Sequence, residues 1–458
     1  MSKLRFLAAL WMAKLIRLAL KLLGRNATHF PGKIALKICP DFMGRIEKPK
    51  RVVAVTGTDG KTTVCNLIND ILIASGQKVL SNPYGSNIDA GIATTLMEGA
   101  SVFGKAKFEL AILEVDERSV GRIFPHVKPD YVVIINLFRD SIMRNAHAEY
   151  IAGIINDNMP TTVKLIINGD DLISAGVAPE NERVYFGIER LDTDITECVN
   201  IINDMPLCPV CREELVYDYR RYHHIGKAHC PACDFKSPEY DYAAGDVDVG
   251  AMTMTVSDKG GSGEYKLLSD SIFNIYNMVT AVAVLREIGL SHEKISAACE
   301  KIKITASRYN VVRVGEIDIV MQMAKDINAL ACSRVFEYVA SKPGKKELVF
   351  MMYSITTEVN WSENVSWLYD CDFEFLNHED ITRIVVIGPR MWDYYMRLRL
   401  AGIPEEKIRC AQEDIVAPEQ LELEKGESVY IFYGTDNIPI TYKVRDKIKR
   451  LIEEREAR

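Results

Sequence analysis

The stretch that decides the fold is Val52-Val-Ala-Val-Thr-Gly-Thr-Asp-Gly-Lys-Thr-Thr63, near the start of a chain of 458 residues. Its apolar beginning predicts a buried strand, its glycines predict a tight turn, and the residues from Lys61 onward predict a helix. In such a strand–loop–helix unit, the backbone N–H groups of the turn and the positive end of the helix dipole face an anion. The segment therefore predicts a phosphate-binding loop.

The residues of this loop are the candidates for ATP binding, namely Gly57, Thr58, Asp59, Gly60, Lys61, Thr62 and Thr63. We expect Lys61 to contact the β- and γ-phosphates and the Thr62 hydroxyl to hold Mg²⁺. The eight-residue P-loop pattern needs a glycine where this chain has Val55, so the loop has the shorter G-x-x-G-K-T-T form. A chance glycine turn before a helix is the alternative, and the strand before the turn disfavours it.

Strand-like and helical runs alternate around this loop, which predicts a doubly wound α/β layer. The predicted buried strands are Val52–Val55, Leu110–Leu113, Tyr131–Ile135 and Lys164–Ile167. The helical runs are Thr62–Ala74, His147–Asn156 and, after a cysteine-rich segment, Ser271–Leu290. A second alternation follows. We expect a basic N-terminal segment (1–50), an ATP-binding domain (51–310) and a smaller C-terminal α/β domain (311–458), with ATP between the two domains.

Composition narrows the class of protein. Apolar residues make up 48% and charged residues 26% of the chain, which is typical of a packed globular protein and excludes wholesale disorder. Lys plus Arg number 56 against 63 Asp plus Glu, so the net charge of −7 excludes a global basic field for nucleic acid. The 11 cysteines in so long a chain indicate a reducing compartment, and we expect a cytoplasmic protein.

Four of the cysteines predict a metal site. Cys208-Pro-Val-Cys211 and Cys230-Pro-Ala-Cys233 are two C-x-x-C knuckles, a pattern typical of a tetrahedral four-thiolate Zn²⁺ site. A redox C-x-x-C would not explain the second pair. His223, His224 and His229 are alternative ligands, but four thiolates already close the shell. We therefore expect a zinc ribbon, inserted at about 205–235, whose metal is structural.

The N-terminus predicts a basic amphipathic helix. The first 40 residues hold eight Lys or Arg and no Asp or Glu. Apolar residues recur at helical spacing, namely Leu4, Leu7, Trp11, Leu15, Leu18 and Leu22. One interpretation is contact with an anionic membrane surface. The other is a helix that packs this stripe on its own domain and leaves its cations in solvent.

The loop resembles that of the Mur ligase family, and later segments extend the resemblance. Glu114 follows the next predicted strand, where Mur ligases place a Mg²⁺-binding glutamate. Asp116 and Glu117 come next and could equally be a solvated loop. Three further segments match in order: Asn136-Leu-Phe-Arg-Asp140, Asn168-Gly-Asp170-Asp171 and Phe273-Asn274-Ile-Tyr-Asn277. The resemblance implies that Asn274 and Asn277 border the adenine of ATP.

A zinc ribbon inside such a domain resembles one branch, the MurT family of ligase subunits of lipid II isoglutaminyl synthase. The resemblance covers essentially the whole chain, including His29-Phe-Pro-Gly32, Tyr84–Gly91 and Ser366–Glu374. It implies that ATP activates the α-carboxyl of D-glutamate in the lipid II stem peptide as an acyl phosphate. Ammonia, supplied by a GatD-like glutamine amidotransferase, then yields D-isoglutamine. A cytoplasmic position at the inner face of the membrane would suit that substrate.

The C-terminal half departs from the family pattern. The family's aspartate that orients the histidine of the partner falls on Asn364, which cannot stabilise an imidazolium by charge. The neighbouring carboxylates Glu363, Asp370 and Asp372 are substitutes. Arg308 and Lys325 are candidates for phosphate or substrate contact. Two alternatives therefore stay open: a Mur-type ligase that uses free ammonia or an amino acid, and a nucleotide-binding regulatory paralogue.

Overall fold

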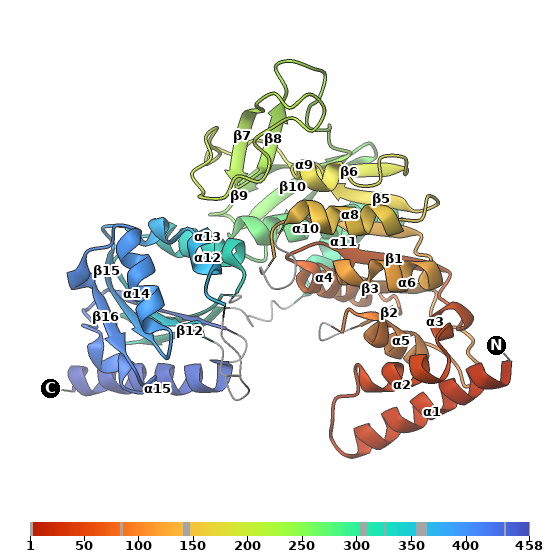
Figure 1. Ribbon diagram of the computed structural model, residues 1–458, viewed down its shortest axis with the longest axis horizontal. Helices are drawn as coiled ribbons and strands as arrows, with labels where there is room; N and C mark the ends of the chain where they lie inside the picture. The colour runs from red at the N-terminus through yellow and green to blue at the C-terminus, as the bar shows by residue number, and fades with distance from the viewer. Residues whose placement is uncertain are drawn as a thin grey trace. The chain divides into compact units, whose positions relative to one another are not determined.

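The computed structural model describes residues 3–82, 86–140, 147–302, 309–324, 327–353, 364–434 and 437–457. The chain divides into two compact units (Figure 1). The first comprises residues 1–138, 147–199 and 203–303, and the second comprises residues 139–146, 200–202 and 304–458. Each unit is built on its own sheet.

The first unit contains a nine-stranded sheet in the order β11-β10-β9-β6-β5-β4-β1-β3-β2 among the described residues. Neighbouring strands from β2 through β9 are parallel, while β10 and β11 extend the sheet antiparallel. The strands are β1 (Arg51–Thr56), β2 (Val79–Ser81), β3 (Leu110–Glu114), β4 (Tyr131–Ile134), β5 (Lys164–Asn168), β6 (Arg183–Ile188), β9 (Tyr242–Asp248), β10 (Thr253–Asp258) and β11 (Gly261–Lys266). The central strands are buried on both sides, as continuous apolar runs require.

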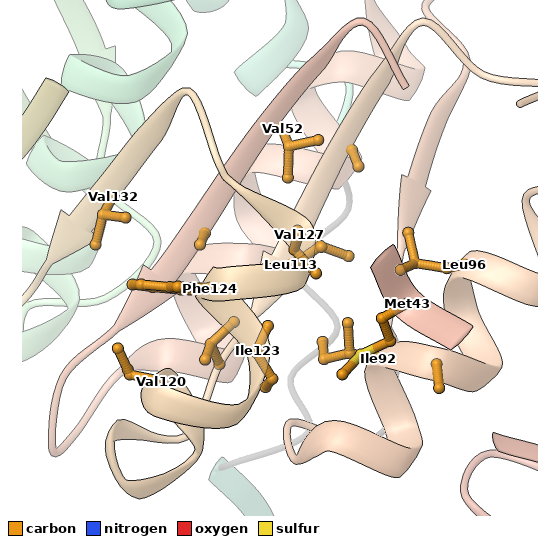
Figure 2. Packing of buried hydrophobic residues seen from close by; sticks show 14 of the residues in the cluster. Met43, Val52, Ile92, Leu96, Leu113, Val120, Ile123, Phe124, Val127 and Val132 are labelled. Carbon is orange, nitrogen blue, oxygen red and sulfur yellow. The ribbon is translucent and has the colours of Figure 1, made fainter. Parts of the chain in front are cut away.

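Helices cover both faces of this sheet. They are α1 (Lys3–Leu22), α2 (Phe30–Ile38), α3 (Phe42–Arg45), α4 (Lys61–Ala74), α5 (Asp89–Glu98), α6 (Val120–Val127), α8 (Ala148–Asn158), α9 (Leu172–Ala175), α10 (Ile272–Glu287) and α11 (His292–Cys299), with a short 3-10 turn η2 (Glu117–Ser119). Figure 2 shows one face of β1, β3 and β4 beside α5 and α6, with Val52, Leu113 and Val132 of the strands in the same buried cluster as Ile92 and Phe124 of the helices. On the opposite face, α4 packs against α10 and α11.

A two-stranded antiparallel ribbon projects from the first unit. It consists of β7 (Val216–Tyr222) and β8 (Ile225–His229), and it lies between the two cysteine knuckles in the sequence. The turn at His223 and His224 joins the strands, and both of these side chains are buried. The tip of the ribbon therefore faces the body of the unit.

The second unit contains a six-stranded sheet in the order β12-β13-β17-β14-β15-β16 among its described residues. Only β12 runs antiparallel to its neighbour. The strands are β12 (Tyr309–Val314), β13 (Ile317–Met323), β14 (Lys346–Met351), β15 (Ile381–Ile387), β16 (Ile408–Ala411) and β17 (Ser428–Tyr433). The helices are α12 (Ala329–Ser341), α13 (Trp367–Asp370), α14 (Met391–Leu400) and α15 (Ile438–Glu456), with 3-10 turns η3 (Phe373–Leu376), η4 (Glu405–Lys407) and η5 (Ala417–Gln420). The predicted α/β fold is confirmed.

One prediction about the N-terminal helix is wrong in its detail. The helix packs on its own unit, but through Phe6, Ala9, Leu10 and Ala13, which are buried. Leu7 of the predicted core stripe is partly buried against the core, but Leu4, Leu15 and Leu22 are 79%, 62% and 80% exposed. Small residues decide the packing face because Ala9 and Ala13 allow α1 to approach α2 closely. In the described part of the chain, we find no helix with the length and apolarity that a membrane span requires.

Candidate functional site

The loop between β1 and α4 has a backbone that requires glycine. Gly57 and Gly60 have φ angles of 137° and 89°, in the left-handed region that other residues avoid. A Cβ at Gly60 would lie 2.5 Å from Oδ1 of Asn277, on α10. A Cβ at Gly57 would lie 3.0 Å from the carbonyl oxygen of Asn136. The two glycines therefore let the loop pass close to α10 on one side and to the segment after β4 on the other.

Asn136 holds the loop in this shape. Its carbonyl oxygen accepts from the Thr58 N–H at 2.9 Å, and its side-chain oxygen accepts from the Asp59 N–H at 2.9 Å. Its amide also donates to the carbonyl oxygen of Asp59 at 3.1 Å. The Phe138 N–H donates to the Thr58 hydroxyl at 2.9 Å. These bonds join the loop to the segment after β4, so the protein itself supports the conformation of the loop.

Lys61 begins α4 and forms a buried ion pair with Glu117. Its ammonium lies 2.8 Å from Oε1 of Glu117, and the two side chains are 12% and 6% exposed. The ammonium also donates to the carbonyl oxygens of Gly57 and Thr58. Burial disfavours the charged form, but the attraction of Glu117, with smaller contributions from Asp59 and Glu114, raises the pKa of Lys61 above its usual value. A cation is therefore held at the mouth of the loop.

Glu114 ends β3 and is only 3% exposed. Its carboxylate accepts from the side-chain amide of Asn87 at 2.8 Å, and its backbone is paired with Asn82. The interpretation of Asp116 and Glu117 as a solvated loop is wrong, because they are 7% and 4% exposed. Asp116 caps the η2 turn by accepting from the Arg118 N–H. This turn folds Glu117 back toward Lys61.

The other predicted nucleotide residues lie around the same loop. Asn277 faces Gly60, and its amide lies 3.5 Å from Oδ1 of Asn274, one turn earlier on α10. Thr62 and Thr63 follow Lys61 in the first turn of α4 and are partly exposed. The helix N-terminus, the glycine turn and one buried cation together form a site suited to a polyphosphate.

The turn after β5 connects the site to the ribbon. Asp171 accepts hydrogen bonds from the Leu137 N–H at 2.7 Å and the Ser174 hydroxyl at 2.5 Å, and its other oxygen lies 3.1 Å from Nε2 of His224. Burial alone would raise the pKa of Asp171, but the imidazole of His224 and these hydrogen bonds lower it below its ordinary value. Asp170 accepts from Tyr276 at 2.6 Å and pairs with Arg221 at 2.7 Å.

The ribbon tip therefore lies against the elements that form the loop. The ring of Tyr222 packs on Phe273 of the α10 start, with centroids 5.2 Å apart, and on Phe138, with centroids 6.0 Å apart. The His224 ring lies 5.0 Å from that of Phe138. Phe138 is the residue whose N–H contacts Thr58. The insertion is thus packed on two supports of the nucleotide loop. The sequence motifs carry no signal for this contact.

The four predicted metal ligands come together at the base of the ribbon. The Sγ atoms of Cys208, Cys211, Cys230 and Cys233 all lie within 4.8 Å of one another. Such a cluster fits the donor set of a tetrahedral metal site. The three histidines lie elsewhere: His223 and His224 are buried at the tip, and His229 pairs with Asp218. The expectation that the cluster could hold a metal without histidine is consistent with this arrangement.

The predicted residues of the second unit that the structure describes have different surroundings. Asn364 is exposed, and its side-chain oxygen accepts from the N–H and hydroxyl of Ser366. Asp370 ends α13 and is partly exposed. Asp372 is buried and accepts from Asn200 and from the Ile201 N–H, so its carboxylate serves the packing of this unit. Arg308, Lys325 and Glu363 lie outside the described residues.

Comparisons with known proteins agree with this architecture. The model of the Mur ligase middle domain matches residues 55–205, and the model of the MurT ligase C-terminal domain matches residues 327–435. A solved pseudomurein peptide ligase type C from Methanothermus fervidus has a TM-score of 0.68 at 20% identity and covers 89% of this chain and 81% of its own. MurF from Acinetobacter baumannii has a TM-score of 0.60 at 15% identity and covers 91% of this chain and 80% of its own. The predicted Mur ligase fold is confirmed.

Curated relatives extend the likeness to both units. The MurT subunit of lipid II isoglutaminyl synthase (glutamine-hydrolyzing) from Streptococcus pneumoniae is 31% identical over 392 residues, which are 84% of this chain and 85% of that protein. The subunit of the same name from Staphylococcus aureus strain COL is 29% identical over 86% of this chain and 88% of that protein. The resemblance inferred from the motifs is thus confirmed, and the chain belongs to the MurT family of Mur-type ligases.

Proposed function

We propose that this protein is the ATP-dependent ligase subunit that amidates the D-glutamate α-carboxyl of the lipid II stem peptide. The observation that carries the proposal is the pre-shaped loop with its buried Lys61–Glu117 pair, in a chain whose MurT relatives are named for that reaction. The loop binds an anionic polyphosphate by its backbone N–H groups, the start of α4 and the Lys61 ammonium.

The reaction needs two displacement steps. An oxygen of the acceptor carboxylate attacks the γ-phosphorus of ATP, the bond to the β-phosphate oxygen breaks, and ADP leaves with that electron pair. Ammonia then attacks the acyl carbon, inorganic phosphate leaves, and the nitrogen loses a proton to form the amide. Lys61 stabilises the charge that spreads over the phosphate oxygens in the first step.

A divalent cation fits the donors at this site. Glu114 supplies carboxylate oxygens and Thr62 supplies a hydroxyl, and these hard ligands suit Mg²⁺. When bound, Mg²⁺ neutralises phosphate charge. The Asn87 amide, 2.8 Å from Oε1 of Glu114, orients that carboxylate. Zn²⁺ fits the four thiols, and with no open position it would fold the ribbon and take no part in the reaction.

A glutaminase partner is the proposed source of ammonia. The second unit carries an exposed apolar row on α14, in which Trp392, Met396 and Leu400 are 60%, 53% and 65% exposed. Such a row suits a protein partner. Asn364 is exposed and has no charge to offer to a histidine of that partner. A ligase that takes free ammonia is therefore the second candidate function, and Asn364 is the observation that favours it.

The phosphoryl-transfer step is tested with Lys61→Ala. We expect loss of ATP-dependent amidation of lipid II, with release of phosphate from ATP falling at least about a hundredfold, because one charge-stabilising group is removed. Lys50→Ala is the matched control, because Lys50 pairs with Glu109 at the surface and both side chains are more than 70% exposed. Full amidation by Lys61→Ala would refute the mechanism.

The nitrogen source is tested with the same purified protein. Lipid II and ATP are supplied with ammonium or with glutamine plus a GatD-like subunit. Amidation that requires the partner when glutamine is the donor supports the two-subunit function. Amidation with ammonium, together with no gain from any glutaminase, supports the second candidate. ATP binding without phosphate release under all conditions would support a regulatory paralogue and overturn both.

A further inference from the structure

Helix α1 carries two apolar faces, of which one is buried against the protein and the other is largely exposed. The buried face consists of Phe6, Ala9, Leu10 and Ala13. The second face, which we call the leucine stripe, consists of Leu4, Trp11, Leu15, Leu18 and Leu22, with exposed fractions of 79%, 47%, 62%, 56% and 80%. At about 100° per residue, the stripe occupies one narrow sector opposite the buried face. Figure 1 shows α1 at the outer edge of its unit, next to α2.

The stripe is not explained by folding. Single exposed apolar residues are ordinary on protein surfaces, but a continuous row of large ones marks a contact surface. The helix is already anchored by its opposite face, and the Lys14 ammonium fastens it further by donating to the carbonyl oxygens of Met97 and Ala100 at 2.7 and 2.8 Å. The stripe could therefore be polar at no cost to this packing.

The charges around the stripe identify the kind of partner. Residues 1–40 hold eight Lys or Arg and no Asp or Glu, although the whole chain has a net charge of −7. Lys3, Lys14, Arg17 and Lys21 recur at helical spacing and lie along one flank of the stripe. Lys14 is bonded to backbone carbonyls and Arg17 pairs with Glu98, so the exposed Lys3 and Lys21 are the cations that this flank offers to a partner. Two copies of such a face would repel each other in a two-fold dimer. A surface that is both anionic and apolar attracts it.

A cavity at the C-terminal end of α1 adds a place for an anionic group. It has a volume of about 230 Å³, and its lining includes Arg17, Lys21, Arg25 and the hydroxyl-bearing Thr28 and Thr95, together with Glu98, which pairs with Arg17. Cationic side chains and hydroxyls are the donors that bind phosphate oxygens. The cavity lies beside the last turns of α1, which ends at Leu22. An apolar surface thus adjoins a phosphate-binding cavity, and the two complement the acyl chains and the phosphate of a phospholipid.

We propose that α1 lies flat on an anionic phospholipid bilayer, with the leucine stripe among the acyl chains and its basic flank against the lipid phosphates. A helix of this pattern binds in the plane of the interface and does not span the membrane. Trp11 lies in the stripe, at the depth where indole rings gather. Its indole N–H donates to the Val102 carbonyl oxygen at 2.8 Å, so the ring is held in place.

The test is co-sedimentation of the full-length protein with vesicles of phosphatidylcholine alone or mixed with phosphatidylglycerol. We expect binding to the mixed vesicles only, weakened by salt, with a blue shift of the Trp11 emission that is absent in Trp11→Phe. Leu15→Ser/Leu18→Ser should weaken binding about tenfold or more, because two large apolar side chains no longer enter the interface. Lys21→Glu should weaken it about fivefold or more.

Ile73→Ser/Val249→Ser is the matched control, because these aliphatic residues of the same unit are 57% and 52% exposed. It should bind as the unmodified protein does. Failure of the unmodified protein to bind anionic vesicles, or undiminished binding by Leu15→Ser/Leu18→Ser, would overturn the proposal. A dimer in solution that this variant dissociates would overturn it in favour of a second copy. Vesicle binding is read without ligase activity, so either result leaves the proposed function standing.

Discussion

Glu117→Gln tests whether Glu117 is the electrostatic partner of Lys61 in the empty loop. The two side chains are 2.8 Å apart and 12% and 6% exposed, so the substitution leaves a buried ammonium without its carboxylate. Removing one partner of a buried pair costs about 3–5 kcal/mol. Asp59 and Glu114 also attract Lys61, which places the expected loss at the lower end, about 3 kcal/mol. A bound polyphosphate would supply the missing negative charge, and the loss should then shrink to about 1 kcal/mol.

The assay is thermal unfolding of the protein with and without saturating ATP and Mg²⁺. For a unit of this size, about 3 kcal/mol corresponds to a fall in Tm of about 6 °C. Without nucleotide, Glu117→Gln should melt that much lower, and with nucleotide most of the difference should disappear. The double variant Lys61→Ala/Glu117→Gln should be more stable than Glu117→Gln alone, because no orphan charge remains. Glu109→Gln is the control, since its surface pair contributes about 1 kcal/mol at most.

The reasoning is refuted by an equal loss of stability with and without nucleotide. That result would mean that Glu117 serves packing, and that the Lys61 charge is balanced by other groups. A double variant less stable than Glu117→Gln would contradict the same account, because it would show that the orphan ammonium is not the source of the cost.

Three further outcomes are expected. Gly60→Ala should weaken ATP binding, measured by calorimetry, about tenfold or more. The backbone φ of 89° is unfavourable for alanine, and the added Cβ would lie 2.5 Å from Oδ1 of Asn277. Unchanged affinity would contradict this. Treatment with a chelator, or Cys211→Ser, should lower ATP affinity as well as ribbon stability if the four thiols hold the proposed zinc, because Tyr222 packs on the loop supports. ATP affinity that survives ribbon unfolding would refute the coupling. Folding lowers the pKa of Asp171, so the stability that its carboxylate contributes is present above the unfolded pKa and is lost as pH falls through the folded pKa. In Asp171→Asn, the free energy of unfolding, followed by circular dichroism, should therefore depend less steeply on pH in the acid range. An unchanged dependence on pH would contradict this.

Local patterns were enough to predict many of the elements. Continuous apolar runs marked β1, β3, β4 and β5, because both faces of such strands are buried and neither face needs polar residues for contact with solvent. The antiparallel edge from β9 to β11 and the β12 strand were not predicted. These strands are partly exposed and lack the continuous apolar runs of the central strands, so their place depends on the strand beside them.

The helix α1 shows where periodicity fails. Its heptad-like leucines indicated one apolar face, yet the buried face is built on Ala9 and Ala13. Spacing tells which residues share a face, but not which face the rest of the chain can approach. Close packing against α2 needs small side chains, and this steric condition belongs to two helices at once.

The sequence by itself determined the parts of this protein that depend on contiguous residues: the glycine loop with Lys61, the two cysteine knuckles and the family to which the chain belongs. The residues of the loop and of each knuckle lie within a few positions of one another, so local backbone geometry brings each of these sets together, and the order of such motifs along the chain indicated the family. Only the tertiary structure decided that Glu117 pairs with Lys61, that Tyr222 supports the loop from the ribbon, and that the leucine stripe faces solvent. These contacts join residues 51 or more positions apart or involve a choice of packing face, and both depend on how the whole sheet and its helices close around one core.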